Sequence, residues 1–214
     1  MAVMTSPIEI VGGIDRTVST TTRDGQEAKV VRASRSYPSP VEHVWDALPS
    51  PERIPRWCAP VPGALRVGGR YQVEGNAGGE VLTCEPPHAF SLTWEMQGTS
   101  WVEVTLEPEG DGTRLHLVHT AHVPEEFWGT YGPGAVGTGW DLSLLGLHLH
   151  LASGQDVTKD HGEAWTGSDE GRAVMATSSR GWADASIADG TDEQAARAAE
   201  AATTAFYTGV PADA

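Results

Sequence analysis

The chain has 214 residues, enough for one generous domain or for one domain with a helical appendage. Its net charge of −15 argues against nucleic acid or an anionic membrane as a partner, because phosphate binding needs clustered Lys and Arg. No apolar run approaches the roughly 20 residues of a membrane helix, and the first residues do not resemble a secretion signal, so we expect a cytoplasmic protein. Cys58 and Cys84 form no CxxC pair, which gives neither a zinc site nor a disulfide scaffold any support.

Residues 1–27 are expected to be a polar N-terminal segment. Within it, the Thr-rich residues 17–22 (TVSTTT) favour an edge strand. The turn-like residues 23–26 (RDGQ) would join this strand, as a hairpin, to a second strand at residues 28–37 (AKVVRASRSY).

Two short helices are predicted next. Residues 41–48 (VEHVWDAL) place apolar side chains at positions i, i+3, i+4 and i+7, the pattern of an amphipathic helix. Residues 51–57 (PERIPRW) indicate a single helical turn that directs Ile54 and Trp57 inward.

A run of short strands follows, separated by links that contain Gly. Apolar and polar residues alternate in several of them, which is typical of an antiparallel sheet with one buried face. Short links between successive strands favour a meander. The predicted strands are residues 70–75, 79–85, 89–96, 100–107 and 113–123.

A long helix is predicted at residues 137–154, ending at Gly154. An antiparallel sheet with this helix on its concave face is a two-layer α+β arrangement, and we assign it to residues 28–154. The apolar stripe of the helix consists of Trp140, Leu144, Leu147 and Leu151.

Residues 155–214 form an Ala-rich, acidic C-terminal extension, for which we predict an α-hairpin. Residues 191–194 (TDEQ) read as a capping box for a second helix at about 192–206. The hairpin is expected to dock on the main domain, for instance on the outer sheet face near Trp101; the alternative is dimerisation or the docking of a partner. The predicted apolar faces are Val174, Ser178, Trp182 and Ala185 on the first helix and Ala195, Ala199, Ala202 and Phe206 on the second.

A set of short motifs in residues 28–153 resembles the family named after the activator of heat-shock protein 90 ATPase. That family lies in the START and polyketide-cyclase-like (SRPBCC) superfamily. The resemblance implies the helix-grip fold of the birch-pollen allergen and a hollow between sheet and long helix that often holds an apolar ligand. The extension resembles one shared by a bacterial subgroup. The motifs are VWxAL at 44–48, PERxxxW at 51–57, GGxY at 68–71, GxVL at 79–82, TWE at 93–95, GTxLxLxH at 112–119 and GW at 139–140.

Aromatic residues from three predicted elements are the candidate walls of this hollow. Trp57, Trp94 and Trp140 come from the short helix, the sheet and the long helix, and aromatic walls suit a flat or apolar ligand. The full candidate ligand-binding set is Trp57, Tyr71, Trp94, Leu117, His119, Trp140 and Leu144.

The histidines do not indicate a metal site. On a strand, residues three apart point to opposite faces, so His116 and His122 would face away from His119. His148 and His150 are two apart on a helix and do not converge either. His119 shares its predicted face with apolar residues, and three roles stay open for it: a core residue, a polar group that holds one end of a ligand, and a weak candidate for a general acid or base.

Three functional hypotheses follow. The first is a protein that binds a small apolar or aromatic molecule in the hollow. The second is an enzyme of the cyclase or hydratase kind that uses the same hollow. The third is a protein-interaction module, including chaperone regulation or a homodimer formed through the C-terminal helices. None of them calls for a cofactor or a metal ion.

Overall fold

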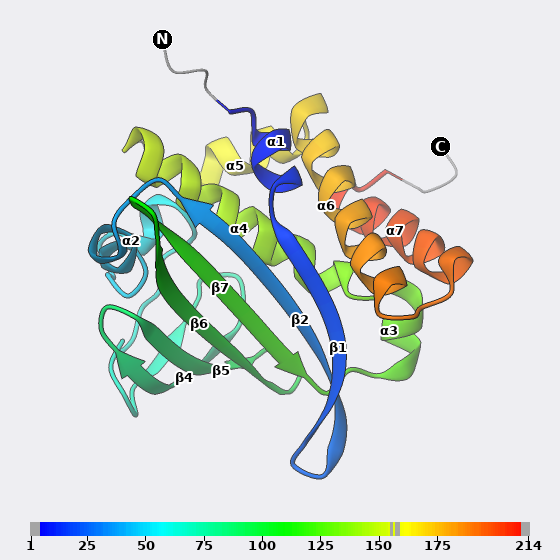
Figure 1. Cartoon of the computed structure of the whole chain (residues 1–214), viewed down its shortest axis with the longest axis horizontal. Helices are drawn as coiled ribbons and strands as arrows, with labels where there is room; N and C mark the ends of the chain where they lie inside the picture. The colour runs from blue at the N-terminus through cyan, green and yellow to red at the C-terminus, as the bar shows by residue number, and fades with distance from the viewer. Residues whose placement is uncertain (1–4, 155, 157–158, 211–214) are drawn as a thin grey trace.

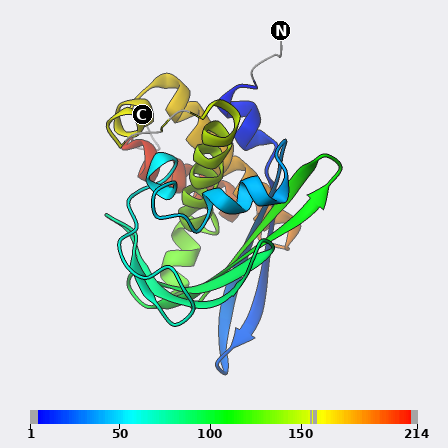
Figure 2. The same cartoon turned by 90° about the vertical axis from the view of Figure 1, so that its left-hand side faces the viewer.

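The structure, a computed structural model, describes residues 5–154, 156 and 159–210. An antiparallel seven-stranded sheet, in the order β1-β2-β7-β6-β5-β4-β3, curves beneath the helices (Figures 1 and 2). The elements in chain order are α1 (Pro7–Gly12), β1 (Asp15–Arg23), β2 (Gln26–Tyr37), α2 (Val41–Ala47), the 3-10 helix η1 (Ile54–Arg56), β3 (Arg70–Gln72), β4 (Gly78–Glu85), β5 (Ala89–Glu95), β6 (Thr99–Glu109), β7 (Gly112–Ala121), α3 (Glu125–Tyr131), α4 (Gly134–Ser153), α5 (Lys159–Thr166), α6 (Asp169–Ala188) and α7 (Glu193–Thr208).

The predicted N-terminal hairpin and edge strand are confirmed. Arg23 pairs with Gln26, and the two residues between them, Asp24 and Gly25, have φ values of 51° and 78°. Positive φ at both positions defines the type I′ turn, whose twist matches that of the flanking strands. The helix α1 before this hairpin was not predicted.

The α1 helix begins at a capping box. The hydroxyl of Ser6 accepts a hydrogen bond from the Glu9 amide, and the Glu9 carboxylate accepts one from the Ser6 amide at 2.8 Å. Ile10 and Val11 of this helix are buried. The S-x-x-E spacing was a readable signal for a helix start, although the polar composition of the segment concealed it.

The α+β helix-grip arrangement is confirmed, with α4 on the concave face of the sheet (Figure 2). Leu144 and Leu147 of the predicted stripe are buried, and Gly154 ends the helix with a φ of 66°. The inward residues of the central strands are buried between the sheet and the helices: Val31 and Ala33 on β2, Val102, Val104 and Leu106 on β6, and Leu115 and Leu117 on β7.

Within its described residues, the extension contains three helices rather than the two predicted, and they cover a different surface. The α6 helix packs against α1, α4 and β1, and α7 packs against α3 and α4 (Figure 1). The prediction that the extension docks on the outer sheet face near Trp101 is wrong. Arg23 covers that indole instead, with its guanidinium 3.9 Å from the ring centre. Residues 155, 157–158 and 211–214 of the extension lie outside the described residues.

Two details of α7 also differ from the prediction. The residue that caps it is Asp192, whose side chain accepts from the Ala195 amide at 3.0 Å, whereas the Thr191 hydroxyl is bound by Ser186. The buried face is turned by about one residue relative to the predicted stripe, and Phe206 is 64% exposed. Hydrogen bonds to body carbonyls fix this rotation: Thr203 donates to Tyr131 and Tyr207 donates to Ala135.

The contact between α4 and α6 leads to a test with two glycines. A Cβ at Gly137 would lie 2.2 Å from the ring of Trp182, whereas a Cβ at Gly129 in α3 would meet nothing within 4 Å. We therefore predict that Gly137→Ala lowers the free energy of unfolding by about 2 kcal/mol, through overpacking. Gly129→Ala, the control, should raise it by up to about 1 kcal/mol, since Ala favours helix. Urea unfolding measures both, and equal effects of the two variants would contradict this packing.

Candidate functional site

The interior of the molecule contains two clusters of buried apolar residues. The main cluster lies between the sheet and the helices, and a smaller one consists of Tyr71, Val73 and Val81. Leu92 and Trp94 of β5 pack against both clusters, yet both side chains remain partly exposed. These two residues therefore join the clusters and remain partly accessible to solvent.

The inner face of β5 is the open part of the concave side. Its three inward residues, Phe90, Leu92 and Trp94, pair across the sheet with Val104, Val102 and Ser100. All three residues of β6 are buried, whereas all three of β5 are partly exposed. Neighbours on one face of a sheet share the same covering layer, so the helices cover β6 closely and β5 loosely. We use the name hollow for this partly exposed inner face of β5, formed by Phe90, Leu92 and Trp94, because the family resemblance implies a hollow between sheet and long helix.

Tryptophans from α2 and α4 contact the inner face of β5. Trp45 meets Phe90 edge-on at 6.0 Å between ring centres, and Trp140 lies 4.9 Å from Trp94. Trp57 follows η1 and is also partly exposed. Two helices, α2 and α4, thus bring indole rings against the β5 face.

A chain of hydrogen bonds lies behind Trp140. The Trp140 indole donates to Nδ1 of His119 at 3.0 Å, and Nε2 of His119 lies 2.8 Å from the Ser100 hydroxyl. An indole can only donate, so Nδ1 is the acceptor and the ring proton sits on Nε2. Ser100 then accepts from His119 and donates to the Trp94 carbonyl at 2.7 Å. The chain fixes Trp140 against Trp94 and leaves no nitrogen of His119 unpaired.

Burial sets the protonation state of His119. The side chain is almost completely enclosed, which lowers its pKa to about 4. An imidazolium would also lose the hydrogen bond from Trp140, because its Nδ1 could no longer accept. At neutral pH the ring is therefore neutral and serves as a positioning residue for Trp140.

The structure distributes the other predicted site residues over both clusters. Leu117 and Leu144 are buried in the main cluster, and Tyr71 belongs to the smaller one. The polar tips of two aromatic residues are already bound: the Tyr71 hydroxyl donates to Thr93 at 2.6 Å, and the Trp57 indole donates to Ala47 at 3.0 Å. These two residues can offer a ligand only the apolar part of their rings.

Several residues around the hollow escaped the sequence analysis. Ser100 pairs with His119 from the neighbouring strand, and Phe90 and Leu92 complete the open face of β5. Cys58 follows η1, and its thiol contacts Ser143 of α4. The alternation of β5 was a readable signal for Phe90 and Leu92, whereas the contact between Cys58 and Ser143 depends on how the chain between α2 and β3 folds back.

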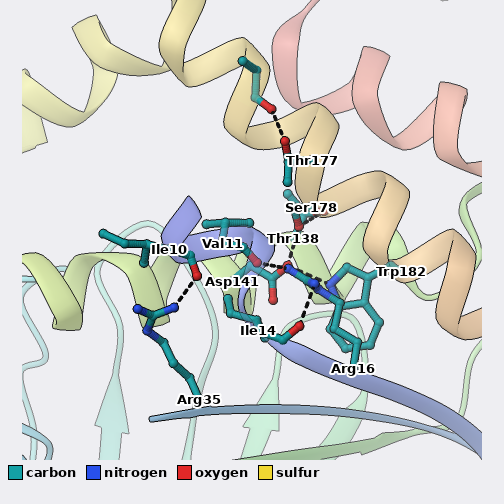
Figure 3. A network of polar contacts seen from close by, with 11 residues as sticks. Ile10, Val11, Ile14, Arg16, Arg35, Thr138, Asp141, Thr177, Ser178 and Trp182 are labelled. Atoms are coloured by element: carbon teal, nitrogen blue, oxygen red, sulfur yellow. Dashed lines mark hydrogen bonds and ion pairs between the residues drawn. The ribbon is translucent and has the colours of Figure 1, made fainter. Parts of the chain in front are cut away.

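A second polar network lies on the opposite side of α4 (Figure 3). The buried Oδ2 of Asp141 accepts from Arg16 Nε at 2.9 Å, from the Ser178 hydroxyl at 2.5 Å and from the Trp182 indole at 3.1 Å. Burial raises the pKa of the Asp141 carboxyl, and Arg16 and Ser178 oppose that effect. Arg16 also donates to the Val11 carbonyl at 2.7 Å. This network joins α1, β1, α4 and α6 and fastens the extension to the body.

The histidines are separated as expected. His116 lies on the outer sheet face beside Ser34, and His122 contacts the Glu27 carbonyl, whereas His119 points inward. Within the residues that the structure describes, no group of three or more His, Cys, Asp or Glu side chains could hold a metal ion. In the same residues, every helix is too short or too polar to span a lipid bilayer.

The antiparallel sheet with α4 on its concave face is the helix-grip fold of the START and polyketide-cyclase-like superfamily. Residues 38–152 match the family described as activator of Hsp90 ATPase homolog 1-like protein, and the chain belongs to that family. No curated protein matches the chain in sequence.

Solved structures share more than the family domain. CalU16 from Micromonospora echinospora is similar in its crystal structure, with a TM-score of 0.63 and 30% identity over 80% of this chain and 97% of that one. Its solution NMR structure gives a TM-score of 0.68 and 28% identity over 88% and 100%. This overlap is longer than residues 38–152, so CalU16 also shares part of the segments that precede or follow the family match. An HSP90 activator from Plasmodium falciparum, 19% identical with a TM-score of 0.50 over 59% and 96%, shares the fold alone.

The His119 geometry gives a prediction that depends on pH. The pKa in the unfolded chain is about 6.5, so below this pH the unfolded state binds a proton that the folded state excludes until about pH 4. As the pH falls from about 6.5 to about 4, His119 should lower the free energy of unfolding by about 3 kcal/mol. Long-range ¹H–¹⁵N NMR should show a neutral ring, protonated on Nε2, down to pH 5. A doubly protonated ring at pH 6 in the folded protein would contradict this assignment.

Proposed function

We propose that the protein binds a small apolar or aromatic molecule in the hollow over β5. The observation that carries the proposal is the partial exposure of Phe90, Leu92 and Trp94, inward-facing residues whose cross-strand partners are buried. Large apolar side chains on an inner face that the covering layer leaves open supply the contact area of a ligand site. The Trp94–Trp140 pair offers ring faces to a flat molecule.

The polar groups around the hollow support an uncharged ligand. The ring of His119 is neutral, and its two nitrogens are bound by Trp140 and Ser100. The Tyr71 hydroxyl and the Trp57 indole are bound to backbone carbonyls. Affinity would therefore come from apolar burial and stacking, with Trp140 held in place by His119.

A neutral fluorescent probe, N-phenyl-1-naphthylamine, tests the proposal. We predict a saturable rise in its fluorescence with the wild-type chain and an affinity at least tenfold lower in Trp94→Ala, because the stacking surface of the hollow is lost. Trp101→Ala is the matched control, since this Trp lies on the outer face of the same sheet and should leave the affinity unchanged. Unchanged binding in Trp94→Ala, or an interior fully packed with side chains in a crystal structure, would refute the proposal.

The enzyme hypothesis gains no support from the geometry. A general acid or base needs a free titratable atom within hydrogen-bond reach of a substrate. Both nitrogens of His119 are engaged, and in the described chain its hydrogen-bond partners are Trp140 and Ser100, neither of which is an acid. The cyclase- or hydratase-type alternative remains a prediction from the sequence.

An exposed aromatic surface favours protein interaction as a second candidate function. Phe127 of α3 and Phe206 of α7 are 47% and 64% exposed, and Tyr131 contacts both rings. Contiguous exposed apolar side chains on a soluble domain mark contact surfaces. Chaperone regulation and a homodimer through the C-terminal helices are two versions of this candidate.

Two measurements separate these versions. If the surface contacts the chaperone, immobilised protein should retain heat-shock protein 90 from its own cell, and Phe127→Ser with Phe206→Ser should lose it. If it contacts a second copy, sedimentation should show a concentration-dependent dimer that the same substitutions abolish. A monomer that retains no chaperone would remove both versions.

A further inference from the structure

A cavity lies away from the hollow, where the extension meets the body. It is a partly open cavity of about 90 Å³ between α3, the start of α4, α6 and α7. Its walls are mostly apolar and include Trp128, Tyr131, Ala183 and Ala199. Part of the wall belongs to the body and part to the extension, so the cavity exists only when the two are packed together.

The hydrogen-bonding groups in these walls are nearly all occupied. The Thr203 hydroxyl donates to the Tyr131 carbonyl at 3.0 Å, and Ser186 donates to Thr191 at 2.8 Å. Ser179 is the exception: its hydroxyl is buried and has no hydrogen-bond partner within the described residues. A buried hydroxyl without a partner is destabilising, which makes it a natural position for a hydrogen bond from a bound molecule.

The charges at the cavity are balanced. Glu200 is the acidic residue of the lining, and Arg197 at 2.8 Å and Arg180 at 3.3 Å neutralise its carboxylate. A charged ligand would thus find no free counter-ion here and would lose its hydration. An uncharged ligand gives up much less hydration free energy when it enters the cavity.

We propose that this cavity is a separate binding site for a small uncharged molecule with a short apolar body and one hydroxyl group. Apolar cavities of roughly 150 Å³ bind benzene, so a smaller one suits about four to six non-hydrogen atoms. The hydroxyl of the ligand pairs with Ser179, and its apolar body lies against Ala183, Ala199 and Trp128. Because body and extension both line the site, binding stabilises the docked extension.

The test uses 1-butanol and xenon as probes on the full chain, followed by ¹H–¹⁵N NMR. Butanol should produce saturable shifts at Ser179, Ala183 and Ala199 and raise the melting temperature. Ser179→Ala should weaken butanol about tenfold, since one hydrogen bond is lost. The same variant should leave xenon binding unchanged, because xenon makes no hydrogen bond.

Two filling variants complete the test. Ala199→Leu and the milder Ala183→Val should each abolish or strongly weaken the binding of both probes while the spectrum stays native-like elsewhere. Shifts that grow linearly with butanol, or that centre on Trp94 and Trp140 of the hollow, would overturn the proposal. So would the absence of any saturable shift with both probes, which would mean that the cavity holds water only.

Discussion

The buried carboxylate of Asp141 is the interaction on which the arrangement of this molecule depends. It lies on the central helix α4 and receives Arg16 from β1 on one side and Ser178 and Trp182 from α6 on the other. A buried charge is tolerated only when paired, and removal of one partner of such a pair costs about 3–5 kcal/mol. The extension is therefore fastened to the body by an electrostatic constraint as well as by apolar packing.

The same helix organises the hollow. Trp140 precedes Asp141, and consecutive residues on a helix point about 100° apart. Trp140 consequently faces β5 and is fixed by His119. Its neighbour Asp141 faces the extension, where it meets Ser178 and Trp182 (Figure 3). Small residues on α4 allow α6 to approach it closely. At Gly137 the Trp182 ring of α6 occupies the position that a side chain would take.

Local signals in the sequence predicted the elements well. The Asp-Gly turn, the alternation in the strands and Gly154 at the end of α4 each depend on a few neighbouring residues, so they can be read without the fold. The Asp141–Arg16 pair could not be predicted, because its partners are 125 residues apart. A lone carboxylate in the apolar stretch of residues 137–154 was the available sign that a buried partner exists.

The candidate site was only partly accessible to the same reasoning. Period-2 alternation indicates which residues face inward, and it correctly placed Trp94 and His119 on the concave side. It does not indicate how closely the helices cover each strand, and that coverage distinguishes β5 from β6. The rotation of α7 is a further example, since the carbonyls that bind Thr203 and Tyr207 come from distant segments.

The Asp141 network also affects which fragments of the chain keep its partners together. A fragment limited to the family-matched residues 38–152 would lack Arg16 at one end and Ser178 and Trp182 at the other. Asp141 would then be a bare charge on the helix, one residue away from the wall of the hollow. We therefore expect a stable fragment to extend beyond the family-matched residues and to include the N-terminal hairpin and the C-terminal helices, which hold the partners of Asp141.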